Sequence, residues 1–243
     1  MNLSELTLFF LEDHCEIVMP RLGDASLRRK LKALDSNISD IYPPSGSGLR
    51  AWEIIDLNPD WLGFSGEYNE VQLKENIILP ILTLARQGVR PFVMGKCPEY
   101  PIDYKDKKIQ LEGIADMVYG KAPSSYTRYI DFPLLCVHVY KRGANPVTVS
   151  QAMAQLLGAL WIISQKNLER GCESEVYGVM IKGQIWHFTE LHRSESKGVV
   201  QYHACFDFGG FGIESELEVI LKSLRHYFFQ IQQILEREMD PYA

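Results

Sequence analysis

The chain has 243 residues, a length that one hydrophobic core can organise with or without an appendage. With 46% hydrophobic and 23% charged residues, its composition favours a packed globular protein and excludes disordered and fibrous classes. Its 25 Lys and Arg against 31 Asp and Glu give a net charge of −6, which argues against a chain-wide electrostatic footprint for nucleic acid. Binding of nucleic acid by a local basic patch is still possible.

No stretch approaches the roughly 20 uncharged apolar residues that crossing a bilayer requires. The first residues, MNLSELTLFFLEDHCEI, lack a basic start and carry acidic residues early, so we expect neither a signal peptide nor a membrane anchor. The five cysteines are widely spaced and include no CxxC pair. This pattern favours a cytoplasmic protein with free thiols over a disulfide framework or a zinc site.

The first sixty residues predict a helical extension. Apolar residues favour a helix over 3–18, and a basic stretch favours a second helix over 26–34. The breaker run YPPSGSG at 42–48 is the one linker-like segment. We therefore divide the chain into an N-terminal helical extension, residues 1–60, and an α/β domain, residues 61–243.

The rest of the chain alternates between helical and strand patterns. Apolar residues three or four apart predict a helix over 73–87, in which Pro80 kinks the helix or marks its true start. Further patterns predict strands over 89–95, 111–120, 132–141, 175–183, 184–191 and 199–208, and helices over 149–165 and 214–238.

The order of these segments predicts the fold class. The strand over 132–141 is almost continuously apolar, which is typical of a central strand. The helix after it predicts a βαβ crossover, and the turn at Lys182 and Gly183 predicts a hairpin. We expect an α/β protein with a mixed sheet flanked by helices.

Five segments carry a resemblance to a known family. In chain order they are NEVQLKENIILPIL, GIADMVYG, VHVYKRG, SQAMAQLL and EVYGVMIKGQIWHF. Together they resemble the restriction-endonuclease-like, PD-(D/E)XK, superfamily over roughly residues 67 to 191. The closest match is the nuclease domain of type I restriction motor subunits and related small bacterial proteins. The resemblance implies a restriction-endonuclease-like core and a setting in bacterial defence or DNA maintenance.

The resemblance also implies a set of site residues. Glu70 matches the helix glutamate of the first motif, Asp116 the metal-binding strand aspartate, and Lys141 the family lysine. Gln155, with Gln151 as the other choice, matches the glutamine of the following helix. Catalysis would use all four positions, and Asp116 and Glu70 would hold Mg²⁺.

One position departs from the family pattern. Two residues before Lys141, the family carries a metal-binding Glu or Asp, whereas this chain has Val139. Mg²⁺ prefers carboxylate oxygens, so the site is incomplete unless another carboxylate replaces the missing one. Glu70 is the best replacement, with Glu67 and Glu75 in reserve. If the family geometry persists, we expect Val139→Glu to raise the affinity for Mg²⁺ or to create activity.

Each candidate residue also has a structural explanation. In a strand, Val139 and Lys141 share one face, while His138 and Tyr140 share the other. Lys141 can simply emerge into solvent at a strand end. The glutamate fits the first turn of a helix, the glutamines are ordinary helix formers, and His138 fits a core. Asp116 is the exception, because aspartate is disfavoured in strands and therefore favours a special role.

The sequence leaves three hypotheses. The first is a diverged nuclease-superfamily protein that binds nucleic acid or a protein partner in a larger complex without cutting. The second is an active Mg²⁺-dependent endonuclease that uses Asp116, Lys141 and a relocated carboxylate. The third is a structural α/β protein. Assembly into a homo-oligomer is open, and the basic stretch SLRRKLK is more typical of a solvated helix face than of a phosphate-binding surface.

Overall fold

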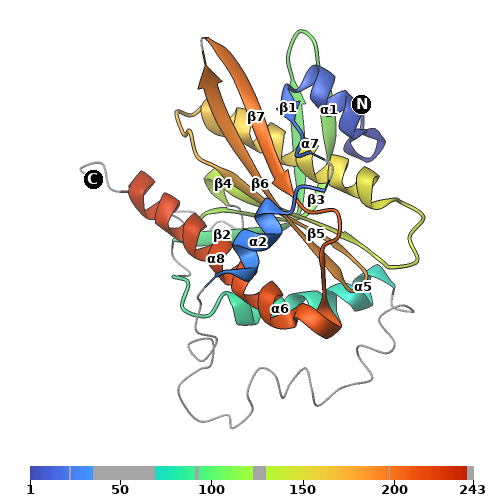
Figure 1. Cartoon of the computed structure of the whole chain (residues 1–243). Helices are drawn as coiled ribbons and strands as arrows, with labels where there is room; N and C mark the ends of the chain where they lie inside the picture. Colours follow the sequence, from blue (N-terminus) through green and yellow to red (C-terminus); the bar gives the residue numbers. More distant parts are fainter. Residues whose placement is uncertain (22, 35–68, 91–92, 123–129, 197, 240–243) are drawn as a thin grey trace.

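The structure is a computed structural model that describes residues 1–21, 23–34, 69–90, 93–122, 130–196 and 198–239. At its centre lies an open mixed sheet of eight strands in the order β1-β7-β6-β5-β4-β3-β2, with β8 paired to β6 (Figure 1). The strands are β1 (Ile17–Val18), β2 (Met94–Lys105), β3 (Gln110–Lys121), β4 (Asp131–Lys141), β5 (Val176–Lys182), β6 (Ile185–Ser196), β7 (Val199–Phe206) and β8 (Phe211–Gly212). The helical elements are η1 (Leu3–Glu5), α1 (Leu8–His14), α2 (Ser26–Lys32), α5 (Glu70–Leu73), η3 (Lys74–Ile78), α6 (Leu79–Ala85), α7 (Val149–Leu168) and α8 (Ile213–Met239).

The centre of the sheet is built by the predicted βαβ crossover. Strands β4 and β5 pair in parallel, and α7 connects them. Strands β5 and β6 form the predicted hairpin, whose turn uses a positive φ of 60° at Gly183, a conformation that glycine adopts without strain. The expected α/β class with a mixed sheet is confirmed.

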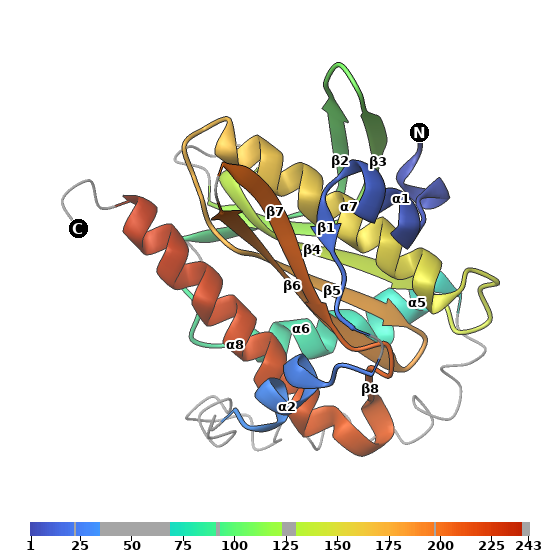
Figure 2. The same cartoon turned by 45° about the horizontal axis from the view of Figure 1, so that its top comes forward.

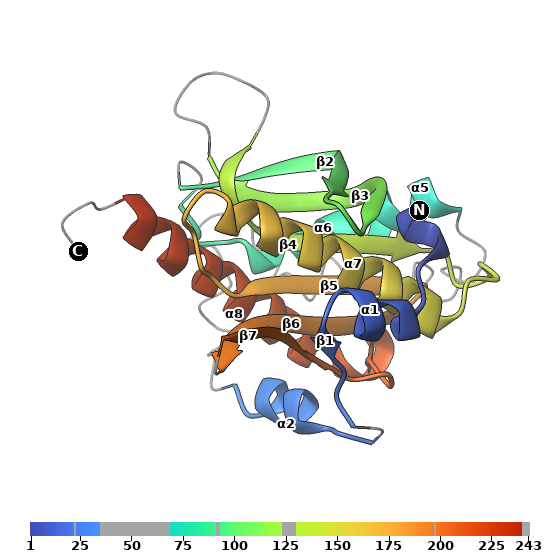
Figure 3. The same cartoon turned by 90° about the horizontal axis from the view of Figure 1, so that it is seen from above.

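Two helical layers cover the sheet. Helices α7 and α1 lie on one face, and α6 and α8 lie on the other (Figures 2 and 3). Each face has its own apolar core: Leu156 and Val139 belong to the core under α7, and Phe228 and Tyr140 belong to the core under α8. The two faces are therefore chemically separate, and the face onto which a strand residue points decides its neighbours.

Helix α7 is buried around nearly its whole circumference. One side packs on β4 and β5, and η1 and α1 cover another. Gly158 permits this close packing, since a Cβ there would overlap Cδ1 of Leu6 and come within 3.1 Å of Cδ2 of Leu3. A helix that is apolar all round requires such double coverage.

The single helix predicted over 3–18 is wrong. Thr7 is extended and caps α1 through a hydrogen bond from the backbone N–H of Phe10, so a new helix starts there. Glu16 has a positive φ of 55°, and the chain then enters β1, which pairs in parallel with β7. The described part of the N-terminal region thus belongs to the sheet and the core. The breaker run and the domain boundary at residue 60 lie outside the described residues.

Two further predictions need correction. The helix predicted over 73–87 begins earlier, at Glu70, and contains the π-helical turn η3 just before Pro80, the second residue of α6. Proline lacks the N–H for the regular helical bond and clashes with the preceding turn, which accounts for the wider turn. The strand predicted over 89–95 instead runs from Met94 to Lys105 as β2, at the edge of the sheet.

None of the helices in the described part of the chain combines the length and apolar character that crossing a membrane requires. The longest, α8, presents a buried apolar stripe to the sheet and charged residues on its outer side. Its sequence is that of an amphipathic helix packed on a protein core.

Candidate functional site

The candidate site lies where β3 separates from β4. Their pairing starts at Met117 opposite His138 and continues toward the β3 end at Lys121. The preceding part of β3 pairs with β2 and, at Glu112, forms an isolated bridge with Asn2. In Figure 2 the β2–β3 hairpin projects away from the rest of the sheet. Asp116 is the residue at this fork.

The Asp116 carboxylate has two partners. Oδ2 accepts a hydrogen bond of 2.8 Å from the backbone N–H of Tyr140, and Oδ1 lies 3.6 Å from Nζ of Lys74. The Asp116 side chain is only 18% exposed. In a continuous ladder, a β3 backbone carbonyl would accept the hydrogen bond from the Tyr140 N–H. Here the Asp116 carboxylate accepts it instead, which explains why an aspartate occurs within this strand.

His138 and Tyr140 form the buried wall of this site. Nδ1 of His138 lies 3.0 Å from the Tyr140 hydroxyl, and the ring of Tyr119 packs 5.0 Å from the His138 ring. Burial lowers the pKa of His138 to about 3, so the imidazole is neutral near pH 7. Burial raises the pKa of Tyr140 well above its ordinary value. Lys74 completes the site with its ammonium 5.6 Å from the centre of the Tyr140 ring.

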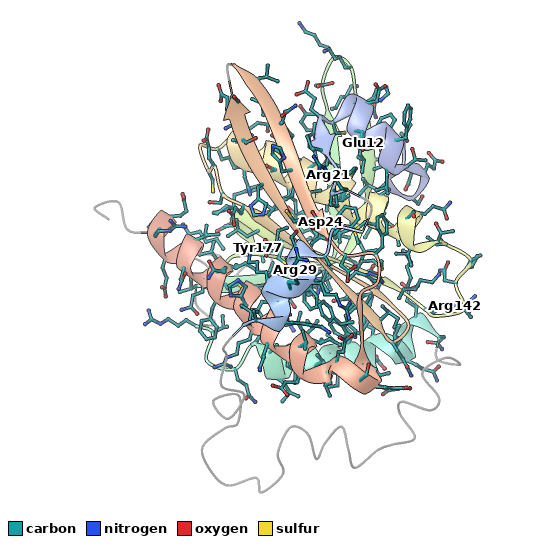
Figure 4. All side chains as sticks on the ribbon, viewed as in Figure 1. Glu12, Arg21, Asp24, Arg29, Arg142 and Tyr177 are labelled. Carbon is teal, nitrogen blue, oxygen red and sulfur yellow. The ribbon has the colours of Figure 1, made fainter. Side chains whose placement is uncertain are left out.

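Lys141 belongs to the opposite face of the sheet from this wall. Val139 packs in the core under α7, whereas Tyr140 packs in the core under α8. Side chains alternate along a strand, so Lys141 starts on the α7 face with Val139. Arg142, the next residue, lies at the outer margin of the molecule (Figure 4). Asp116 thus contacts the Tyr140 backbone and Lys74, and the structure shows no contact between Asp116 and Lys141 among the described residues.

Glu70 and Gln155 also lie on different layers. Glu70 is the first residue of α5, where Asn69 and Gln72 form a capping box. Lys74 follows one helical turn later and contacts Asp116, so the Glu70 helix runs beside the fork. Gln155 lies on α7, across the sheet.

The other candidates from the sequence occupy separate positions. Gln151 is engaged in the capping box of α7 with Thr148, Glu75 is exposed, and Glu67 lies outside the described residues. In the described part of the chain, no group of three or more His, Cys, Asp and Glu side chains is arranged to hold a metal ion.

The basic residues of α2 bind carboxylates of the same chain. Arg28 binds Asp207 at 2.9 Å and both oxygens of Glu216 at 2.7 and 2.9 Å, and its guanidinium lies over the ring of Phe211. Nζ of Lys32 lies 2.7 Å from Glu216. These pairs fix α2 on the start of α8. Arg29, Lys30 and Lys32 are exposed, as expected for a solvated helix face, but Arg28 and Lys32 already pair with carboxylates.

A buried ionic cluster joins α2 to the sheet. Glu190 is 2% exposed, and both of its oxygens accept 2.8 Å hydrogen bonds from Nζ of Lys30. His192 bridges the two glutamates of the cluster, with Nε2 at 3.4 Å from Glu190 and Nδ1 at 2.9 Å from Glu175. A hydrogen bond with Cys205, followed by the one with Glu190, raises the pKa of His192 to about 10.

Sequence reasoning missed Lys74 and the Glu190 cluster. Lys74 sits four residues after Glu70, a spacing that places both on one side of a helix, and this signal was available. Glu190 and His192 flank Leu191 in one strand, and Lys30, the partner of Glu190, is far away in sequence. No local pattern could have joined them.

No protein-family model matches the chain, and no curated protein matches it in sequence. The fold and the site define the class of the protein as mixed α/β with an open sheet and a carboxylate where β3 separates from β4.

Proposed function

We propose that this chain is a diverged, non-cleaving relative of the restriction-endonuclease-like proteins that acts as a binding module for another protein. The observation that carries the proposal is that the Asp116 carboxylate already has two partners within the chain. Its two oxygens face the Tyr140 N–H and the Lys74 ammonium, so a cation at this carboxylate would compete with one hydrogen bond and one ion pair.

The residues beside Asp116 support the same conclusion. The two β4 positions on its face hold His138 and Tyr140, both fully buried and both neutral near pH 7. Neither offers an anionic oxygen, which is the ligand that Mg²⁺ prefers. A lysine at the fork further disfavours a second cation by charge repulsion.

A protein partner is favoured over nucleic acid by the charges. The chain carries a net charge of −6, and a phosphate backbone binds positively charged surfaces. The basic helix α2 uses Arg28, Lys30 and Lys32 in ion pairs within the chain. These cations are therefore not available to bind phosphates without losing their present partners.

An active Mg²⁺-dependent endonuclease is the second candidate, and one observation favours it. The Lys74 contact brings the helix that carries Glu70 beside Asp116, which is the arrangement that a relocated carboxylate needs. In that mechanism Asp116 and Glu70 would hold Mg²⁺, and the cation would lower the pKa of the attacking water. Lys141 and Gln155 would have to act from the other face of the sheet.

The experiment that separates the two candidates is calorimetric titration of Mg²⁺ and Mn²⁺ into the wild-type protein and into Asp116→Ala. Plasmid and single-stranded DNA are incubated with the same samples. We expect no binding that depends on Asp116 and no nicking. Lys74→Met serves as the control, because it frees one oxygen of Asp116 without adding a ligand.

Nicking that is lost in Asp116→Ala would overturn the proposal and establish the second candidate. If the protein binds DNA without cutting it, seen as slower migration of the DNA in a gel-shift assay at physiological salt, the proposal would also be overturned. The chain would then be a nucleic-acid-binding module. Light scattering of the purified protein shows whether a second copy of the chain is the protein partner.

A further inference from the structure

A pocket of about 310 Å³ opens beside the candidate site, between α6 and strands β2 and β3. Its apolar walls come from Leu79, Leu82 and Val89, and its aromatic wall is Tyr119. Two cationic side chains, Arg86 and Lys96, line the same space. Pockets of this size hold small organic molecules, and the few polar groups in them set which molecule binds.

The Arg86 guanidinium packs against two aromatic rings. Its guanidinium lies 5.4 Å from the centre of the Tyr119 ring and 6.0 Å from that of Phe228, and Nη2 donates to the Met94 carbonyl at 3.3 Å. A guanidinium has five N–H donors, so this one hydrogen bond to the described residues leaves most of them for a ligand. Among the described residues, no carboxylate forms an ion pair with Arg86.

Lys96 brings a second positive charge to the same pocket. It lies on β2, opposite Tyr119 of β3, and no carboxylate in the described part of the chain pairs with it. Burial, followed by the nearby charge of Arg86, lowers the pKa of Lys96. Two like charges at one pocket repel each other, and an anion between them removes that cost.

We propose that this pocket binds a small organic anion. Its phosphate or carboxylate group lies between Arg86 and Lys96, and its apolar part packs against Leu82, Val89 and Tyr119. The pocket is separate from the Asp116 carboxylate, although Tyr119 also packs against His138 of that site. The inference needs neither the nuclease resemblance nor the proposed protein partner.

The test titrates phenyl phosphate, benzoate and inorganic phosphate into the full chain by calorimetry. We expect one binding site per chain, tighter binding of an aromatic anion than of inorganic phosphate, and at least a tenfold loss of affinity in Lys96→Gln. Lys105→Gln, an exposed change on the same strand, is the matched control and should bind as the wild type does. Arg86→Gln is expected to lose more, and its fold is checked by urea unfolding.

The comparison of the two aromatic probes identifies the anionic group. Tighter binding of phenyl phosphate supports a phosphate ligand, and tighter binding of benzoate supports a carboxylate. Failure of both probes to bind would overturn the proposal. Equal affinities in Lys96→Gln and Lys105→Gln would overturn it as well, as would inorganic phosphate binding as tightly as phenyl phosphate.

Discussion

The carboxylate of Asp116 joins three elements at one point: β3, the backbone of β4 and the helix that carries Lys74. A backbone N–H that loses its acceptor in a buried place costs about 1–3 kcal/mol. The side chain at this fork therefore stabilises the point where a regular ladder of hydrogen bonds ends.

We expect Asp116→Ala to lower the free energy of unfolding by about 1–3 kcal/mol, because the Tyr140 N–H loses its acceptor. Asp116→Asn keeps a carbonyl oxygen at the same place and should lose less. Urea unfolding of the three proteins measures the difference. Equal losses in both variants would show that the charge pair with Lys74, rather than the hydrogen bond, stabilises the fork.

Val139→Glu gives a second prediction at this scale. Val139 is 1% exposed and packs in the apolar core under α7, where a carboxylate finds no hydrogen-bond partner. We expect a loss of about 2 kcal/mol or more in urea unfolding and no gain in Mg²⁺ affinity. Val199→Glu, at a position that is 55% exposed, is the control and should change stability by less than about 0.5 kcal/mol. A stable Val139→Glu protein that binds Mg²⁺ more tightly would refute this placement.

A special role for Asp116 was predictable from one residue, since aspartate is disfavoured in strands. Its partners were not, because the register between β3 and β4 decides which β4 residues it meets. The alternation of Val139 and Lys141 against His138 and Tyr140 was also predictable. Only the structure shows that Asp116 lies on the side of Tyr140, because the Lys74 ammonium contacts both the Asp116 carboxylate and the Tyr140 ring.

At the scale of elements, long regular patterns predicted well, and strand β2 was not predicted with its true bounds. Helix α7 was predicted within a few residues because its apolar pattern is long and has no interruption. Strand β2 was missed because Pro98 and Pro101 interrupt it. An edge strand tolerates proline, since one side of its backbone needs no partner.

The packing of α7 against η1 and α1 leads to a prediction for Gly158. Added side-chain atoms at this position would overlap Leu6, so Gly158→Val should displace the N-terminal segment from α7. We expect a loss of about 1–3 kcal/mol in urea unfolding and faster proteolytic cleavage within residues 3–14. Gly143→Ala is the control, because the nearest atom to its added Cβ is 3.7 Å away. Unchanged protection of the N-terminal segment in Gly158→Val would contradict this account.

At the scale of the whole molecule, the Glu190 cluster joins α2 to the sheet through charges from distant parts of the chain. Burial raises the pKa of Glu190, but hydrogen bonds from His192 and Lys30 outweigh it and lower the pKa below its ordinary value. A buried carboxylate that is paired in this way stays ionised, and it makes the stability of the protein depend on pH.

The pKa of His192, about 10, is higher than the 6.5 of an unperturbed histidine. Its stabilising effect is therefore complete below pH 6.5 and is lost as the pH rises toward 10. We expect the midpoint of thermal unfolding to fall over this range. In His192→Gln this alkaline decrease should be smaller, and His14→Gln, a change on α1 outside the cluster, should retain it. A parallel decrease in all three proteins would assign the effect to other groups.

The α/β class, the crossover and the hairpin followed from the order of the predicted elements. The pairing of β1 with β7 and the packing of α2 on α8 could not be predicted in this way, because both depend on contacts between the two ends of the sequence. Strand β1 has only two residues, too few for a pattern to stand out. The charges of α2 are indistinguishable in sequence from those of a solvated helix.

The position of the N-terminal segment also affects how the chain matures during synthesis. Leu3, Leu6 and Leu11 find their main apolar surface on α7, which begins only at Val149. At the usual speed of translation, these leucines wait on the order of ten seconds for that helix to emerge. Ribosome-bound chains arrested before α7 should therefore expose the segment to chaperones and proteases, and the first residues can close over the middle of the chain only after α7 has been made.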